Sequence, residues 1–111
     1  MGKTGVLGAF EELVLLAVFH QGSVAYGVSV RRELEERTVS DVTMGAVSAT
    51  LDRLEEKGLL VSRTGERTVS RRGRPRRYFA LSPAGVAELE RTRSVRDSMW
   101  AGADLKNAEV R

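Results

Sequence analysis

Arginine side chains are concentrated in one stretch of the sequence, residues 60–81, which reads LVSRTGERTVSRRGRPRRYFAL. This stretch holds seven arginines and one glutamate, a net charge of +6, whereas the whole chain of 111 residues carries only +3. A guanidinium group binds a phosphate, or the edge of a guanine, through two parallel hydrogen bonds. Such a local excess of positive charge indicates a surface that binds a polyanion.

The residues just before this stretch have the pattern of a helix that could enter a DNA groove. Thr43 suits the N-cap position, and Gly58 suits the left-handed residue that ends a helix. Apolar residues recur with helical spacing at Val47, Leu51 and Leu54. We expect the opposite face to carry Ala46, Ser48, Ala49, Thr50 and Arg53. Small side chains on that face would let the helix backbone approach phosphates, which its N-terminal dipole also favours.

Length and composition restrict the possible classes of protein. A chain of this length is one domain, and its sequence pI of about 9.8 indicates nucleic acid or an anionic membrane as partner. The absence of cysteine excludes disulfides and thiolate chemistry. The longest apolar run, residues 13–19, is too short to cross a bilayer, so a cytoplasmic location without a membrane partner is expected. No pattern indicates an enzyme, a cofactor or a metal site.

The spacing of apolar residues, together with the glycines, prolines and capping residues between them, predicts the helices and strands that position the candidate DNA contacts. Helices are expected at residues 7–21, 25–37, 43–58 and 83–100, strands at 59–63 and 76–81, and a short strand at 39–42. Buried positions are predicted to include Phe10, Leu13, Val14, Ala17, Val18, Val28, Val30 and Leu34, with Leu16 close to them. Three helices followed by a hairpin are typical of a winged helix. The expected fold is mainly α with a small β-hairpin: a winged helix-turn-helix head at residues 1–82, a C-terminal dimerisation helix at 83–101 and a disordered tail at 102–111.

The last predicted helix would be about 27 Å long, and a three-helix head cannot cover all of it. Its apolar stripe is incomplete, which indicates that a second copy of the chain pairs along it. Met99 and Trp100 could line a ligand pocket between the two copies, but packing in the dimer core is the interpretation we favour. The predicted dimer contacts are Phe10, Leu89, Val95, Met99 and Trp100.

Four blocks of the sequence resemble the PadR family of bacterial transcriptional regulators: LGAFEELVLLAVF, AYGVSVRRELEERT, GAVSATLDRLEEKGLL and GRPRRYFALSPAG. The resemblance spans about residues 7–101. It implies a homodimer that binds double-stranded DNA at an inverted repeat, represses neighbouring genes and, in some relatives, releases the DNA when a small aromatic or drug-like effector binds. The family often has a tyrosine where this chain has Ser48, and serine has a shorter reach to the DNA backbone.

Several candidate DNA contacts also have a second interpretation. The segment Arg72-Gly73-Arg74-Pro75 resembles a minor-groove clamp, and its alternative is a solvated charged loop. Arg53 is the best candidate for a base-edge contact, and its alternative is an ion pair with Glu56 or with an acid elsewhere in the chain. Tyr26 could meet a phosphate or pack against the first helix. The predicted DNA contacts are Tyr26, Thr43, Ser48, Thr50, Arg53, Arg63, Arg72, Arg74 and Arg76.

Overall fold

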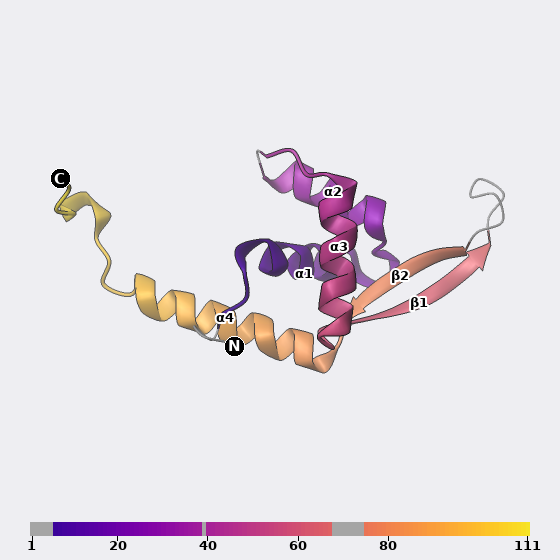
Figure 1. Ribbon diagram of the computed structural model, residues 1–111. Helices are drawn as coiled ribbons and strands as arrows, with labels where there is room; N and C mark the ends of the chain where they lie inside the picture. The colour runs from indigo at the N-terminus through magenta and orange to yellow at the C-terminus, as the bar shows by residue number, and fades with distance from the viewer. Residues whose placement is uncertain (1–5, 39, 68–74) are drawn as a thin grey trace.

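A computed structural model describes residues 6–38, 40–67 and 75–111 of the chain. The elements are α1 (Ala9–Gln21), the 3₁₀ helix η1 (Gly22–Val24), α2 (Gly27–Arg37), α3 (Met44–Glu56), β1 (Leu60–Arg67), β2 (Pro75–Leu81), α4 (Pro83–Trp100) and the 3₁₀ helix η3 (Leu105–Asn107). Figure 1 shows α1, α2 and α3 gathered in a head, with the β1–β2 hairpin projecting on one side and α4 leading away on the other. This order of helices and hairpin confirms the predicted winged-helix architecture.

The predicted ends of α3 are confirmed by their capping hydrogen bonds. The Thr43 hydroxyl accepts from the Ala46 amide at 3.1 Å and so caps α3. Gly58 has a φ of 79°, and the Leu59 amide donates to the Leu54 carbonyl at 2.9 Å, which closes the C-terminal end of the same helix.

The hairpin is joined to the head as well as to itself. β1 and β2 are antiparallel, with Leu60 opposite Leu81 and Ser62 opposite Phe79, and the register is irregular between Thr64 and Arg67. The Phe79 amide also donates to the Ala25 carbonyl at 2.9 Å, which forms an isolated bridge just before α2. The base of the β1–β2 hairpin, which is the wing of this fold, is therefore held against the head by hydrogen bonding.

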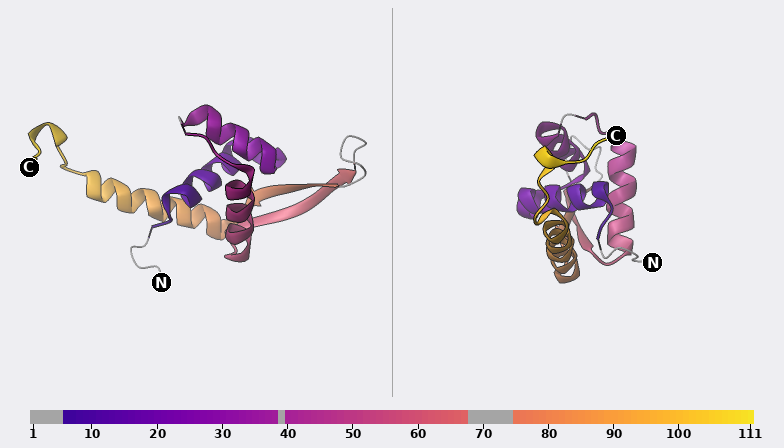
Figure 2. Two further views of the ribbon diagram at one scale, coloured as in Figure 1. Left: turned by 45° about the horizontal axis from the view of Figure 1, so that its top comes forward. Right: turned by 90° about the vertical axis from the view of Figure 1, so that its left-hand side faces the viewer.

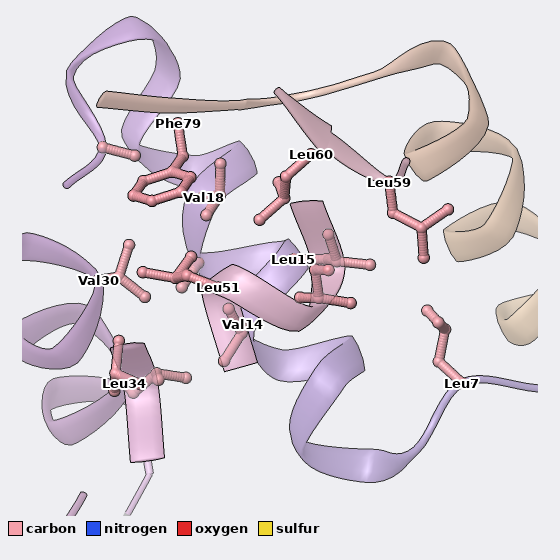
Figure 3. Packing of buried hydrophobic residues seen from close by; sticks show 14 residues of the cluster. Leu7, Val14, Leu15, Val18, Val30, Leu34, Leu51, Leu59, Leu60 and Phe79 are labelled. Carbon is pink, nitrogen blue, oxygen red and sulfur yellow. The ribbon is translucent and has the colours of Figure 1, made fainter. Parts of the chain in front are cut away.

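The core lies where the three head helices meet the base of the hairpin (Figure 3). Its largest fully buried side chains include Leu15 of α1, Leu51 and Leu54 of α3, and Leu60 of β1. Two predicted core residues are instead substantially exposed, namely Leu13 and Val28, each at 40%. Leu15 is fully buried although it lies outside the predicted apolar stripe, because α1 is covered by α2, α3, α4 and β2.

Two further predictions differ from the structure. Residues 40–42 form no strand, and Val39 lies outside the described residues. The C-terminal tail, predicted to be disordered, contains η3, in which the Asp104 side chain accepts from the Lys106 amide at 3.1 Å.

The first half of α4 is part of the head. The Ser82 hydroxyl accepts from the Gly85 amide at 3.0 Å, which caps α4, and donates to the Gly58 carbonyl at 2.6 Å. Further along, the fully buried Thr92 hydroxyl accepts from the Leu7 amide at 3.0 Å. Most α4 side chains beyond Thr92 are exposed, so the second half of α4 extends away from the head.

Gly85 allows α4 to begin this close to the head. A Cβ atom at this position would lie 2.2 Å from the Leu59 carbonyl oxygen. We expect Gly85→Ala to lower the free energy of unfolding by about 1–3 kcal/mol, because the backbone must shift to relieve the overlap. Urea denaturation followed by circular dichroism measures this change, with the exposed Ser94→Ala in the same helix as control. An unchanged midpoint for Gly85→Ala would contradict this close contact between α4 and Leu59.

Candidate nucleic-acid interface

One face of α3 is exposed to solvent and is lined by small side chains toward its N-terminus. The exposed residues are Gly45, Ala46, Ser48, Ala49, Asp52, Arg53 and Glu56. The expectation that Thr50 belongs to this face is wrong, because its side chain is only 3% exposed and shares the packed face with Val47, Leu51 and Leu54. The Thr43 residue at the start of the helix is exposed, with its hydroxyl engaged in the cap.

Beside α3, four residues from three elements form a cluster that we call the arginine–tyrosine cluster: Tyr26, Arg63, Arg76 and Tyr78. The Arg76 guanidinium lies 3.9 Å from the centroid of the Tyr26 ring, and the Arg63 guanidinium lies 4.6 Å from that of Tyr78. The two rings meet edge to face at 6.1 Å. Contact between a guanidinium and an aromatic face is attractive and restricts the side chain. The cluster therefore holds two of the arginines predicted to contact DNA, Arg63 and Arg76, in place.

The arginines of this cluster keep hydrogen-bonding capacity for a ligand. Among the described residues Arg63 donates once, to the Ser23 carbonyl at 3.1 Å, and a guanidinium has five N–H donors. The Nε atom of Arg76 is buried without a hydrogen-bond partner among the described residues, so a ligand would be bound by the terminal nitrogens of this side chain. The Tyr26 ring thus packs beneath Arg76 and against Tyr78, an arrangement that neither interpretation of Tyr26 anticipated.

A cleft of about 360 Å³ connects the cluster with α3. Its lining includes Tyr26 and Gly27 at the start of α2, Ser48 and Asp52 on α3, and Arg76 on β2. Three predicted contacts, Tyr26, Ser48 and Arg76, therefore share one cavity although they lie far apart in the sequence. Free amides at the start of a helix add positive potential to such a site.

Arg53 is held by an acid from α1. Its Nε donates to the Glu11 carboxylate at 3.1 Å, and Lys57 binds the same oxygen at 2.9 Å. Burial raises the pKa of Glu11, but the hydrogen bonds from Lys57 and Arg53 outweigh this effect and hold the pKa below its usual value. Of the two interpretations of Arg53, the structure shows the ion pair, with an acid outside α3; the Arg53 side chain is still 48% exposed.

Arg77 is engaged by acids of α3, a role that sequence reasoning missed. Its guanidinium donates to Asp52 at 2.9 Å and also pairs with Glu55. The sequence offered little indication of this ion pairing, because nothing distinguishes Arg77 from the other arginines near it. The predicted contacts Arg72 and Arg74 lie outside the described residues.

The predicted dimer residues divide into two groups along the chain. Phe10 and Leu89 are partly buried against the core, and Val95 is half-buried. Met99 and Trp100 are 76% and 61% exposed at the end of α4, the part that projects from the head in Figure 2.

An apolar groove of about 510 Å³ lies between α1 and α4, on the head. Its lining residues are Glu12, Leu16, Phe19, Leu81, Val86, Leu89, Glu90 and Arg93. None of the helices in residues 6–38, 40–67 and 75–111 has the length and apolarity needed to cross a membrane.

A helical head with an exposed third helix, and a cationic hairpin beside it, define a winged helix-turn-helix regulator that binds DNA. The sequence profile of the transcriptional regulator PadR-like family matches residues 15–91, more than half of the chain. The chain therefore belongs to the PadR-like family of transcriptional regulators. Members of this family bind DNA and are not enzymes.

Solved structures share this fold at low sequence identity. A PadR-like transcriptional regulator from Bacillus cereus superimposes with a TM-score of 0.71 at 20% identity, over 92% of this chain and 95% of that one. A PadR family transcription regulator from Clostridium difficile gives 0.62 at 22%, over 84% and 88%. RosR from H. salinarum gives 0.67 at 24%, over 90% and 83%. No curated protein matches the sequence.

Proposed function

We propose that this chain is a cytoplasmic homodimeric repressor that binds an inverted repeat near the operon it controls. The observation that carries the proposal is the position of the arginine–tyrosine cluster, which lies across one cleft from the small-residue face of α3. A helix can then enter the major groove while the adjacent cations bind the phosphates that flank it.

The proposed contacts follow from exposure and charge. Ser48 and the capped end of α3 at Thr43 approach the DNA backbone, and Arg63 and Arg76 bind phosphates from the base of the hairpin. Tyr26 supports Arg76 from beneath. Arg53 reaches a base edge only if it exchanges its Glu11 partner for the DNA. For Arg72 and Arg74, the sequence alone supports contact by the hairpin tip with phosphates or the minor groove.

The dimer is proposed to form through α4, with help from α1. Each chain has an apolar groove between these helices and two exposed apolar side chains, Met99 and Trp100. Exposed apolar surfaces of this kind mark sites of protein–protein contact. Antiparallel pairing of two α4 helices would bring the apolar end of each copy toward the groove of the other. A dimer suited to an inverted repeat would place the two α3 helices about 34–36 Å apart, one turn of DNA.

The test of the proposed function is binding of the purified protein to its own upstream DNA across a salt series, with scrambled DNA of equal length as control. We expect at least about a thousandfold preference for the upstream DNA, the range of specific regulators. Equal affinity for both DNAs would contradict sequence-specific regulation. Transcription from the upstream promoter, measured with and without the protein, then distinguishes repression from activation.

The dimer contact on α4 is tested by Val95→Glu combined with Met99→Glu. We expect a monomer by light scattering, because two buried carboxylates at the contact would be desolvated without partners. Ser94→Glu combined with Ser98→Glu adds the same charge at neighbouring exposed positions and should leave the dimer intact. A dimeric Val95/Met99 variant would show that the chains pair elsewhere.

A second function, effector sensing at the dimer interface, is favoured by the exposure of Trp100 beside Met99. Flat aromatic molecules stack on an indole ring. Trp100 is the only tryptophan, so a titration of its fluorescence with planar aromatic compounds reports on this position directly. A ligand that quenches the fluorescence and weakens operator binding supports a sensor; quenching without an effect on DNA binding contradicts it.

A further inference from the structure

Four side chains connect the recognition helix α3 to both strands of the hairpin, and we call them the clasp: Asp52, Glu55, Ser62 and Arg77. The Arg77 guanidinium donates to Asp52 at 2.9 Å and pairs with Glu55 through a second nitrogen. Ser62 of β1 donates to the other oxygen of Glu55 at 2.6 Å and lies 3.4 Å from Nε of Arg77. One arginine of β2 is thus bound to α3 and to β1 at once.

The clasp differs from the neighbouring arginine–tyrosine cluster in what restrains the cations. Arg63 and Arg76 are stacked on tyrosine rings, whereas Arg77 is stacked on the Phe79 ring at 4.7 Å and bound by two carboxylates. The hydrogen bond from Ser62, opposed by partial burial and reinforced by Arg77, holds the pKa of Glu55 below its usual value. Three of the five N–H donors of Arg77 face Ser62, Asp52 and Glu55, and the two carboxylates already offset its charge, so its attraction for a phosphate is weaker than that of Arg63 or Arg76.

The position of the clasp matters because two acids lie on the helix that would face DNA. Asp52 is 64% exposed and lines the cleft shared with Ser48 and Arg76. Uncompensated carboxylates there would repel phosphates. Arg77 pairs with both acids and offsets one of their two negative charges, and its two directional bonds restrict the angle between hairpin and helix.

We infer that Arg77 is a positioning residue, which fixes the wing to the recognition helix through Asp52 and Glu55 and does not itself contact DNA. This inference rests on the proposed function, since the angle matters only if helix and wing bind one DNA together. Exposed ion pairs contribute little to global stability, so the effect is on orientation and specificity. The thermal midpoint should change little when the clasp is removed.

The experiment distinguishes two effects that change DNA binding in opposite directions. Added positive charge strengthens binding to any DNA, whereas loss of the wing orientation weakens binding to the upstream DNA. Asp52→Asn combined with Glu55→Gln raises the net charge by two, so a charge effect alone would strengthen binding to any DNA. If the clasp positions the wing, the ratio of affinities for upstream and scrambled DNA should instead fall by about tenfold, the size of one lost base-pair contact. Arg77→Met should lower that ratio too, and should change the slope of log K against log salt by clearly less than the roughly 0.9 of one phosphate contact.

The orientation itself can be measured without DNA. The chain has no cysteine, so spin labels can be placed on the exposed positions Ala49→Cys in α3 and Pro75→Cys at the outer end of β2. The distance distribution between the labels should broaden in the Asp52/Glu55 variant and in Arg77→Met. Arg63→Met is the matched control: it should leave the distribution unchanged and reduce the salt slope by about 0.9.

An unchanged distance distribution in the Asp52/Glu55 variant, or an equal gain in affinity for both DNAs, would overturn the inference. The inference would also be overturned if Arg77→Met reduced the slope of log K against log salt by about 0.9 and left the distance distribution between the spin labels unchanged. These outcomes are separate from a failure of the proposed function. If the unaltered chain binds both DNAs equally, specific regulation is excluded, whereas the label distances still report whether the clasp holds the wing.

Discussion

Replacing Leu15 by alanine is expected to lower the free energy of unfolding by about 2–5 kcal/mol, because the substitution empties a fully enclosed site. Leu15 has no exposed surface and lies in the middle of α1, which α2, α3, α4 and β2 cover. Its loss would remove a large share of the roughly 5–15 kcal/mol that stabilises a domain of ordinary size. Urea denaturation at one fixed protein concentration measures the change, since the proposed dimer would make stability depend on concentration.

Leu13→Ala is the matched control for this prediction. The same substitution is made two residues away in the same helix, where the side chain is 40% exposed. We expect a loss below about 1 kcal/mol, as for other surface positions. Similar losses at Leu13 and Leu15 would mean that α1 buries a different face from the one described here.

Replacing both Arg63 and Arg76 by alanine is expected to weaken binding to the upstream DNA about thirtyfold at ~0.15 M salt, if each contributes one phosphate contact. The slope of log K against log salt should fall by about 1.8 for the same reason. Both guanidinium groups are already stacked on tyrosine rings, so little side-chain freedom is lost when they bind. Fluorescence anisotropy across a salt series measures affinity and slope together.

The control for this pair removes the same charge from a distant surface. Arg91→Ala combined with Arg111→Ala changes one exposed arginine of α4 and one of the C-terminal tail, and should leave the slope nearly unchanged. If both double variants reduce affinity equally, the effect belongs to net charge and the arginine–tyrosine cluster is not the phosphate-binding surface. Loss of affinity with an unchanged slope would instead indicate a structural role for the two arginines.

Two adjacent acids of α1 connect the parts of the molecule that these experiments examine. Glu11 binds Arg53 and Lys57 of α3, and Glu12 binds Arg96 of α4 at 3.0 Å. The helix at the centre of the core therefore contacts both α3, the proposed recognition helix, and α4, the proposed dimerisation helix. The clasp then connects α3 to the wing.

Local features of this protein were predictable from the sequence alone. The caps at Thr43 and Ser82, the left-handed glycine at position 58 and the order of helices and hairpin all depend on a few neighbouring residues. The concentration of arginine between residues 60 and 81 likewise needs no structure to be seen. Such features are determined locally, because capping and turn geometry involve atoms at most five residues apart.

The tertiary structure decided which side chains meet and which are buried. Thr50 is buried and Leu13 exposed because the neighbours of α3 and α1 cover faces that helical periodicity identifies only approximately. Tyr26 lies beneath Arg76, and Arg53 binds Glu11, although each pair is more than 40 residues apart in the chain. These contacts depend on how the elements pack around α1. Packing is a property of the whole chain, so no single segment of the sequence determines it.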